Sequence, residues 1–183
     1  RDQPALAPQM LSDRMDSARE SQKNVIGGRP QSLSVGTVAA LLFIGSDPRV
    51  KVNDQTSQYL FYFVNQPDVQ QALSDEDESS ALRELIGNYL ERSNSPNLAY
   101  QSAVLAMRYN LKRGLKPALA VLKNKQVAAT QRAYCALAVA KLGNLTHEPQ
   151  LEALLEDQSA CGSIRMGNQQ INTQLRDVAL AAL

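Results

Sequence analysis

The fold is decided by the segment RAYCALAVAKLG, residues Arg132–Gly143, and by a shorter segment of the same kind, RDVALAAL, residues Arg176–Leu183. In each segment an Arg precedes small and apolar residues, and the first segment closes on Leu-Gly. Small residues allow two helices to approach closely, and a Gly after the last apolar residue is typical of a helix end. The two segments therefore predict helices that pack against other helices.

The composition of the chain favours a core built from such helices. Of the 183 residues 44% are hydrophobic and only 5% are aromatic, with no Trp, so Leu, Ala, Val and Ile must supply the core. These are values of globular proteins, and the length suffices for one substantial core. The formal net charge of +1 excludes a strongly polyionic protein. No apolar run approaches the roughly 18 residues that span a bilayer, so we expect no membrane insertion.

The N-terminal residues differ in character from the rest. Residues 1–32 are polar and contain three prolines and the pair Gly27-Gly28, which predicts a flexible or loosely ordered N-terminal arm. Residues 33–183 are expected to form a single helical repeat domain. The chain begins with Arg1 rather than Met. Both a cytoplasmic location and export after removal of an N-terminal signal fit this sequence.

Apolar spacing, Pro starts and Gly ends place the expected helices. They are Thr37–Ile44, Asp54–Asn65, Pro67–Leu73, a helix that starts at Ser74, Pro96–Leu111, Pro117–Lys123, Ala128–Leu142, Pro149–Glu156 and Thr173–Leu183. Tyr59–Val64 is strand-like in composition, but its helical flanks favour a buried helix, with an aromatic binding platform as the alternative. Asp157–Asn172 is rich in Gly, Ser, Gln and Asn and predicts a loop.

The expected helices repeat when they are aligned on their small residues. The first alignment, at an offset of 32, pairs Ala103, Met107 and Asn110 with Cys135, Val139 and Leu142. The second, at an offset of 44, pairs Arg132, Cys135 and Val139 with Arg176, Ala179 and Leu183. Aligning the two Thr-Gln pairs gives 43 instead. Helix pairs with periods of about 30 to 47 residues are typical of helical solenoids.

The segment RAYCALAVAKLG resembles the HEAT-like (armadillo-type) repeat, in which an Arg, small residues and Leu-Gly follow one another. The resemblance is best over Ala99–Asp157 and continues at Thr173–Leu183. The stretch LEDQSACG followed by TQLRDVALAAL is also similar to uncharacterised bacterial HEAT-like proteins, some of them exported. The resemblance implies an all-α fold, a right-handed α-solenoid of antiparallel helix pairs. It also implies structural roles for Arg132 and Arg176, with Asp177 as a candidate ion-pair partner.

Charge is distributed unevenly along the chain. From Arg92 to His147 there are nine Lys and Arg residues and no Asp or Glu, whereas the flanks Asp68–Glu91 and Glu148–Asp157 are acidic. The candidate binding residues in the basic stretch are Arg108, Lys112, Arg113, Lys116, Lys123 and Lys125. One interpretation is that these cations offset the helix dipole at helix C-termini and that the acidic flanks neutralise them within the fold. The other is that they bind an acidic protein or a polyanion such as nucleic acid. Three tyrosines of the stretch fit either base stacking or core packing.

The sequence contains little that could carry catalysis. His147 is the only histidine and lies in THEP, where a solvent-exposed capping position is expected. Cys135 is expected to be a small buried residue, and Cys161 to be either free or bridged to Cys135. We predict no catalytic, cofactor-binding or metal-ligating residues and no enzyme. The leading function is a noncatalytic scaffold that binds another protein, the alternative is a polyanion- or nucleic-acid-binding module, and a cryptic enzyme comes third.

Overall fold

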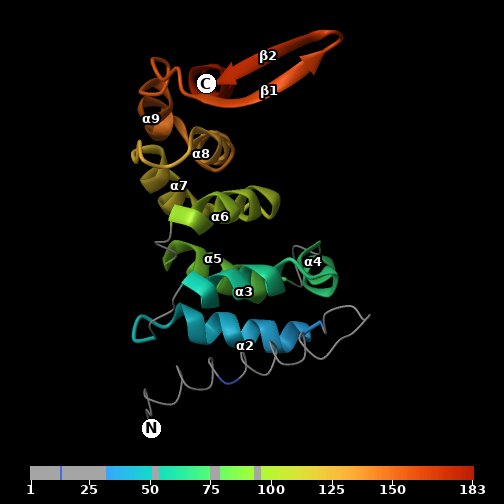
Figure 1. The fold of residues 1–183 in the computed structure, drawn as a ribbon. Coiled ribbons are helices and arrows are strands. Elements are labelled where there is room, and N and C mark those ends of the chain that lie inside the picture. The colour runs from blue at the N-terminus through green and yellow to red at the C-terminus, as the bar shows by residue number, and fades with distance from the viewer. Residues whose placement is uncertain (1–12, 14–31, 51–53, 75–78, 93–95) are drawn as a thin grey trace. The chain divides into compact units, whose positions relative to one another are not determined.

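The computed structural model describes residues 13, 32–50, 54–74, 79–92 and 96–183. These residues are mostly helical and include one small two-stranded sheet (Figure 1). The expected N-terminal arm, residues 1–32, lies outside the described part of the chain except for Asp13 and Ser32. The acidic residues Asp75–Glu78 also lie outside it.

Along the chain, a series of helices is followed by a β-hairpin and a last helix. The first five helices are α2 Val35–Ser46, α3 Asp54–Val64, α4 Pro67–Ser74, α5 Ser80–Arg92 and α6 Pro96–Arg108. After them come η1 Lys112–Gly114, α7 Leu115–Leu122, α8 Ala129–Leu142, η2 Leu145–His147 and α9 Glu148–Glu152. The chain then forms β1 Ala160–Met166, β2 Gln169–Gln174 and α10 Leu175–Ala182.

Most of the expected helices are present, but several boundaries need correction. The expected helix Pro149–Glu156 ends at Glu152, and the expected helix from Thr173 begins only at Leu175, because Thr173 and Gln174 belong to β2. Ser74 is the last residue of α4, and the next helix begins only at Ser80. Helix α6 ends at Arg108 and not at Leu111. The reason is Asn110, whose φ of 52° lies in the left-handed region that terminates helices. The backbone N–H of Leu111 then donates to the carbonyl of Ala106 (2.9 Å) and turns the chain back along α6.

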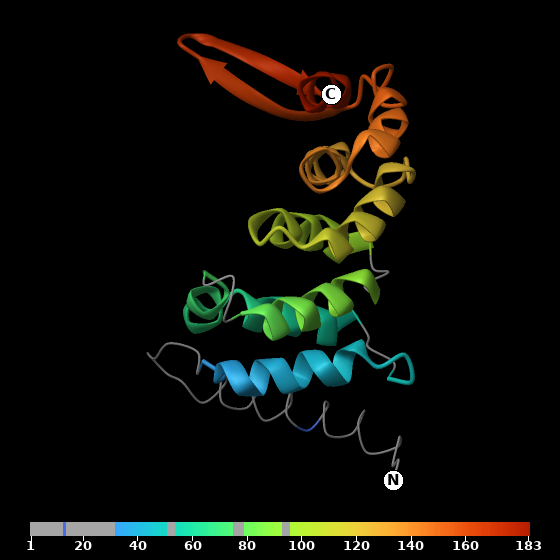
Figure 2. The same ribbon diagram turned by 180° about the vertical axis from the view of Figure 1, so that it is seen from behind.

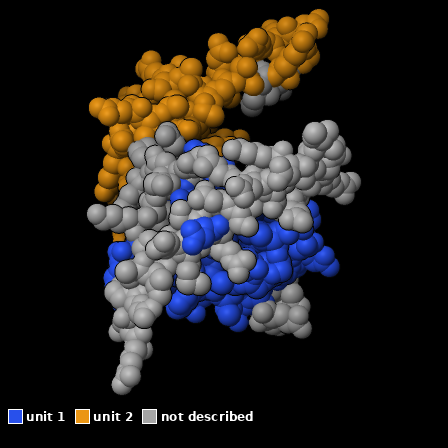
Figure 3. Space-filling model, turned by 60° about the horizontal axis from the view of Figure 1, so that its bottom comes forward, with its two compact units in different colours: residues 1–89 blue, residues 90–183 orange. Residues whose placement is uncertain are grey.

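The chain divides into two compact units, residues 1–89 and residues 90–183 (Figure 3). In unit 1, helices α2, α3 and α4 pack against one another. The strand-like run Tyr59–Val64 is helical, as expected, and buries Leu60, Phe61, Phe63 and Val64. The ring of Phe61 lies 5.9 Å from that of Tyr89, between centroids. These aromatic side chains therefore serve mainly the core of unit 1.

Helix α8 lies at the centre of unit 2. It packs against α6, α7, α9, α10 and β1. Figures 1 and 2 show α6, α8 and α10 following one another in one layer, with α7 and α9 beside them in a second layer. The segment that predicts the fold, Arg132–Gly143, thus supplies the helix that most of unit 2 packs around.

Burial refines the alignment of these helices. The buried residues Ser102, Ala103 and Ala106 of α6 correspond to the buried Cys135, Ala136 and Val139 of α8. This correspondence has an offset of 33 residues, one more than the small residues alone suggested. For α10 the buried Leu175 and Ala179 match Arg132 and Ala136, an offset of 43. Arg176 is therefore no counterpart of Arg132, because Arg132 is buried and Arg176 is exposed.

The expected loop at Asp157–Asn172 is wrong, and the fold of the described residues is to that extent not all-α. Strands β1 and β2 pair antiparallel, with Ser163 opposite Asn172 and Met166 opposite Gln169. The turn between them is Gly167-Asn168, and Gly167 has a φ of +60°. A two-residue Gly-Asn connection is a hairpin signal that the sequence does contain.

Candidate functional site

The six candidate binding residues all lie in unit 2, around α7. Arg108 is the last residue of α6, Lys112 and Arg113 form η1, and Lys116 is in the first turn of α7. Lys123 is the C-cap of α7, and Lys125 follows in the next turn. All six are exposed, and we call them together the basic surface. Five of the six residues thus belong to or cap the successive elements α6, η1 and α7, and Lys125 follows in the turn after them.

The geometry of α7 aligns part of the basic surface. Lys116 and Lys123 are seven residues apart, which places them on one side of the helix, about 10 Å apart along its axis. The opposite side of α7 packs against α6 and α8. Its buried residues are Pro117, Ala118, Val121 and Leu122. The cations therefore follow the solvent side of a helix whose other side is fixed by packing.

One carboxylate neutralises part of the basic surface. Glu91 accepts from Arg113 Nη1 at 3.4 Å and from Lys116 Nζ at 3.3 Å. The side chains of Arg113 and Lys116 remain 50% and 73% exposed, so these ion pairs add little stability. Arg108, Lys112, Lys123 and Lys125 form no ion pair with any residue that the structure describes. The sequence left open that acidic residues of the chain neutralise these cations. Among the described residues, a carboxylate pairs with two of the six cations.

The tyrosines of the basic stretch are used largely in packing. Tyr109 is buried, and the rings of Tyr100 on α6 and Tyr134 on α8 lie 5.3 Å apart between centroids. Tyr134 keeps 41% of its surface exposed. A base could reach only part of one ring pair here, which is less than the row of free aromatic faces that single-strand binding uses.

The solvent side of α8 and α10 carries exposed apolar side chains. Leu137 is 40% exposed and Leu180 is 70% exposed. At the offset of 43 residues the two occupy equivalent positions on neighbouring helices. Arg108 and Lys141 are equivalent at the offset of 33, in the last turns of α6 and α8. Leu137 and Lys141 are exposed and four residues apart, so an apolar side chain and a cation share one side of α8.

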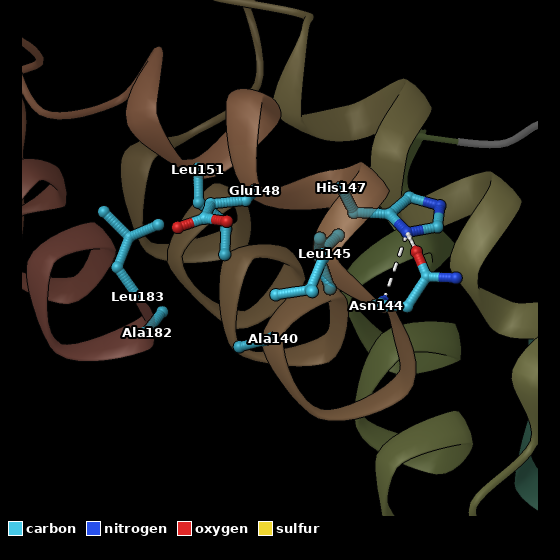
Figure 4. Close-up of a pocket in the computed structure, with 9 residues that line it drawn as sticks. Ala140, Asn144, Leu145, His147, Glu148, Leu151, Ala182 and Leu183 are labelled. Atoms are coloured by element: carbon cyan, nitrogen blue, oxygen red, sulfur yellow. Dashed lines mark hydrogen bonds between the residues drawn. The ribbon is translucent and has the colours of Figure 1, made fainter.

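A pocket of about 350 Å³ lies between α8, the η2–α9 segment and α10 (Figure 4). Its apolar lining includes Leu145, Leu151 and Leu183, and its polar lining includes His147 and Glu148. In Figure 4 the imidazole of His147 and the carboxylate of Glu148 point in opposite directions. The backbone N–H of Asn144 donates to Nδ1 of His147 (3.2 Å), in a capping box for η2. His147 therefore occupies a capping position, as the sequence predicts, but it is half-buried rather than solvent-exposed.

Arg132 is held by a buried ion pair with Asp157, whereas the candidate partner Asp177 pairs with Arg176. Nη1 of Arg132 lies 2.8 Å from Oδ2 of Asp157, and both side chains are largely buried. Hydrogen bonds from Ser159, and the ion pair with Arg132, lower the pKa of Asp157 to about 2. Asp177 lies 3.9 Å from Nε of Arg176, so it is an ion-pair partner of Arg176, and it also accepts from the backbone N–H of Gln174 (2.8 Å) and caps α10. The role of Arg132 is structural, because the pair joins α8 to the base of the hairpin.

The two cysteines are both free, so the alternative of a bridge between them is wrong. Cys135 is fully buried in α8, and this burial raises the pKa of its thiol to about 12. Cys161 lies in β1 rather than in a loop, and its Sγ lies 3.5 Å from the carbonyl oxygen of Thr173. For Cys135 the raised pKa removes the thiolate that nucleophilic or metal chemistry requires.

Comparisons with protein-family models, with curated proteins and with solved structures give no match. Among the residues that the structure describes, no helix is both long and apolar enough to cross a bilayer. Those residues also contain no group of three or more His, Cys, Asp and Glu side chains that could hold a metal ion.

Proposed function

We propose that this protein is a noncatalytic protein–protein interaction scaffold built from HEAT-like helix pairs. The order of helices in unit 2 supports the proposal, because α6, α8 and α10 share one layer while α7 and α9 share the other. Burial that recurs at near-regular offsets supports it as well. In this proposal the pairs continue as a right-handed α-solenoid, an architecture whose extended faces bind partners.

The exposed cations of the basic surface carry the proposal. Four of the six, Arg108, Lys112, Lys123 and Lys125, have no carboxylate partner among the described residues. A basic surface that the fold does not neutralise attracts an acidic partner and orients it during encounter. The partner is therefore expected to present a cluster of Asp and Glu side chains.

A protein partner suits this surface better than nucleic acid does. Leu137 and Leu180 are exposed on α8 and α10, in the layer that also contains α6 and Arg108, whereas the other five cations lie on or next to η1 and α7. Apolar side chains beside cations are typical of protein interfaces, whereas single-strand binding relies on free aromatic faces. The ring of Tyr100 packs against Tyr134, and Tyr109 is buried.

The pocket supports a binding role rather than a catalytic one. A general acid–base pair needs its two groups aimed at one point. His147 and Glu148 point apart (Figure 4), and Nδ1 of His147 is engaged with Asn144.

The test compares the capture of proteins by the full chain and by two charge-reversed variants. Lys112→Glu/Lys123→Glu reverses two cations of the basic surface without breaking an ion pair that the structure shows. Arg165→Glu/Arg176→Glu makes the same change in net charge away from that surface, and it loses only the exposed ion pair of Arg176 with Asp177 (3.9 Å), which adds little stability. We expect purified wild type and the Arg165/Arg176 variant to bind the captured partner, and the Lys112/Lys123 variant to lose it. Rebinding of the purified partner confirms each result.

Two outcomes would overturn the proposal. Equal binding of the partner by all three proteins would show that the basic surface is not the interface. Tight, salt-sensitive binding of duplex or single-stranded oligonucleotides, lost in the Lys112/Lys123 variant, would show that the surface serves nucleic acid instead.

A further inference from the structure

The hairpin β1–β2 stands out because its distal part belongs to no core. It extends away from the helices in both views (Figures 1 and 2). Four consecutive residues of β2, Gln169 to Asn172, are exposed. Successive side chains of a strand point to opposite faces, so both faces of the ribbon meet solvent along this stretch. An isolated two-stranded hairpin is at best marginally stable in water.

The base of the hairpin is firmly attached to the helices. Thr130 Oγ1 on α8 donates to the carbonyl of Cys161 (2.9 Å), and Cys161 is buried. The backbone N–H of Arg176 donates to the carbonyl of Asp157 (2.9 Å). Asp157 is itself paired with the buried Arg132. The ribbon is therefore presented as an arm with a fixed root.

The outer edge of β2 lacks the usual protection of an edge strand. The sheet contains only β1 and β2 in the part of the chain that the structure describes. Natural proteins blunt such edges with Lys, Pro or inward-pointing charges. Residues 169–174, QQINTQ, contain none of these. Strand β1, by contrast, carries the charge of Arg165, which is exposed.

The chemistry of this edge is complementary to itself. Gln169 and Asn172 each offer both amide donors and an amide acceptor, so each can pair with polar groups of a second copy. The side chain of Gln170 donates to Ser163 (3.1 Å), and Gln174 is the N-cap residue of α10. Two copies of β2 bring no like charges together, whereas two copies of β1 would bring two arginines close. If residues 169–174 overlap fully about a two-fold axis, Ile171 stands opposite Asn172 of the second copy and loses part of its 45% exposure.

We propose that the outer edge of β2 pairs antiparallel with β2 of a second copy of this chain. The two hairpins then form one four-stranded sheet about a two-fold axis, the closed symmetry that is most common in homodimers. The four-stranded sheet satisfies the backbone groups of both β2 edges and covers Ile171. The interface is small, so the dimer dissociates on dilution. This inference is independent of the proposed function.

Sedimentation velocity over a wide range of concentrations tests the inference on the full chain. Ser163 and Asn172 form one rung of the hairpin and both are exposed, so lysine at either position gives a pair of variants for comparison. Ser163→Lys also removes the exposed hydrogen bond that Ser163 accepts from Gln170 Nε2 (3.1 Å). Asn172→Lys places a charge at the β2 edge, and Ser163→Lys places the same charge one strand away. We expect wild type and Ser163→Lys to dimerise alike, and Asn172→Lys to raise the dissociation constant by about tenfold or more.

Two sedimentation results would contradict pairing through β2. A wild-type chain that stays monomeric at every concentration overturns the proposal, and so does a dimer that both variants weaken equally or neither weakens. Far-UV circular dichroism shows that each variant has kept its helices. As a second measurement, mild oxidation should cross-link Ile171→Cys chains to Asn172→Cys chains in a mixture, because these positions stand opposite each other, and should cross-link Ser163→Cys to Asn172→Cys chains much more slowly. Equal rates would place the contact elsewhere.

Discussion

Arg132, a residue of the segment Arg132–Gly143, stabilises the packing of neighbouring elements. It is 3% exposed, and its guanidinium reaches Asp157 at 2.8 Å and the carbonyl of Leu122 at 3.4 Å. A buried cation without its partner is costly, typically about 3–5 kcal/mol, because its charge has lost both water and counter-charge. The pair therefore makes α8, the end of α7 and the root of the hairpin interdependent.

The low pKa of Asp157, about 2, makes part of the stability dependent on pH. The unfolded carboxyl has a pKa of roughly 3.9, so the folded state binds this proton less readily. The contribution is present above pH about 4 and is lost as the pH falls towards 2, with a size of about 2 kcal/mol. We expect Asp157→Asn to be less stable at pH 7 and to lack this acid-dependent loss in urea titrations.

The control for that titration is Glu152→Gln, which removes an exposed carboxyl at the end of α9. Its stability should fall with acid as the wild type does. A wild type and an Asp157→Asn variant with parallel pH profiles would contradict the role assigned to Asp157.

The thiol of Cys135 should be unreactive in the folded protein. With a pKa of about 12, on the order of one thiol in ten thousand is ionised at pH 8, and burial blocks access as well. We expect negligible reaction of a Cys161→Ala variant with a chromogenic disulfide reagent until urea unfolds it. Rapid labelling of that variant under native conditions would show that α8 opens locally far more often than its packing implies.

At the scale of the elements, η1 packs so closely against α6 that even one added methyl group should disturb the contact. A Cβ added to Gly114 would meet the Cβ of Ala106 directly. We expect Gly114→Ala to lower the free energy of unfolding by about 1–3 kcal/mol, because either η1 or α6 must shift. Urea unfolding followed by circular dichroism measures this change.

Two further variants separate that contact from a general effect of glycine. Gly36→Ala meets nothing within 4 Å in α2 and should be neutral or stabilising by up to about 1 kcal/mol. Ala106→Gly should partly rescue Gly114→Ala, since it removes the other half of the contact. A double variant with strictly additive losses would locate the strain elsewhere.

The elements differ in how far the sequence reveals them. Helix α8 follows from a local pattern of small and apolar residues, so the sequence predicts its bounds to within one residue. The hairpin has exposed side chains on both faces and therefore no alternating pattern. Its polar composition is typical of a loop, and in the sequence only the Gly167-Asn168 turn indicates two strands. Asp157 as the partner of Arg132 depends on how the chain returns after α9, which no local pattern contains.

The candidate site shows the same division between local and long-range information. Lys116 and Lys123 share one side of α7 because of helix periodicity, which the sequence alone predicts. Their relation to Glu91 does not follow from periodicity, because Glu91 lies 25 residues before Lys116 and reaches it only through packing. The sequence identified the cations, and the fold determines which of them a carboxylate screens.

For the whole molecule, a net charge of +1 conceals two kinds of association surface within unit 2. The basic surface is charged, and the β2 edge carries no charge. Charged encounters weaken as salt screens them, with a Debye length of about 30 Å at 0.01 M and about 3 Å at 1 M. Pairing through backbone and amide hydrogen bonds has no comparable dependence. Salt should therefore separate the two proposed interactions in a single preparation.

We expect the affinity for the acidic partner to fall by about tenfold or more between roughly 0.05 M and 0.5 M NaCl. The dissociation constant of the dimer should change by less than about twofold over the same range, because residues 169–174 contribute no charge. Sedimentation velocity with and without the purified partner measures both constants. A dimer that dissociates with salt would mean that the basic surface, rather than β2, joins the copies. A salt-insensitive complex with the partner would mean that its docking depends on apolar side chains such as Leu137 and Leu180 instead of on the cations.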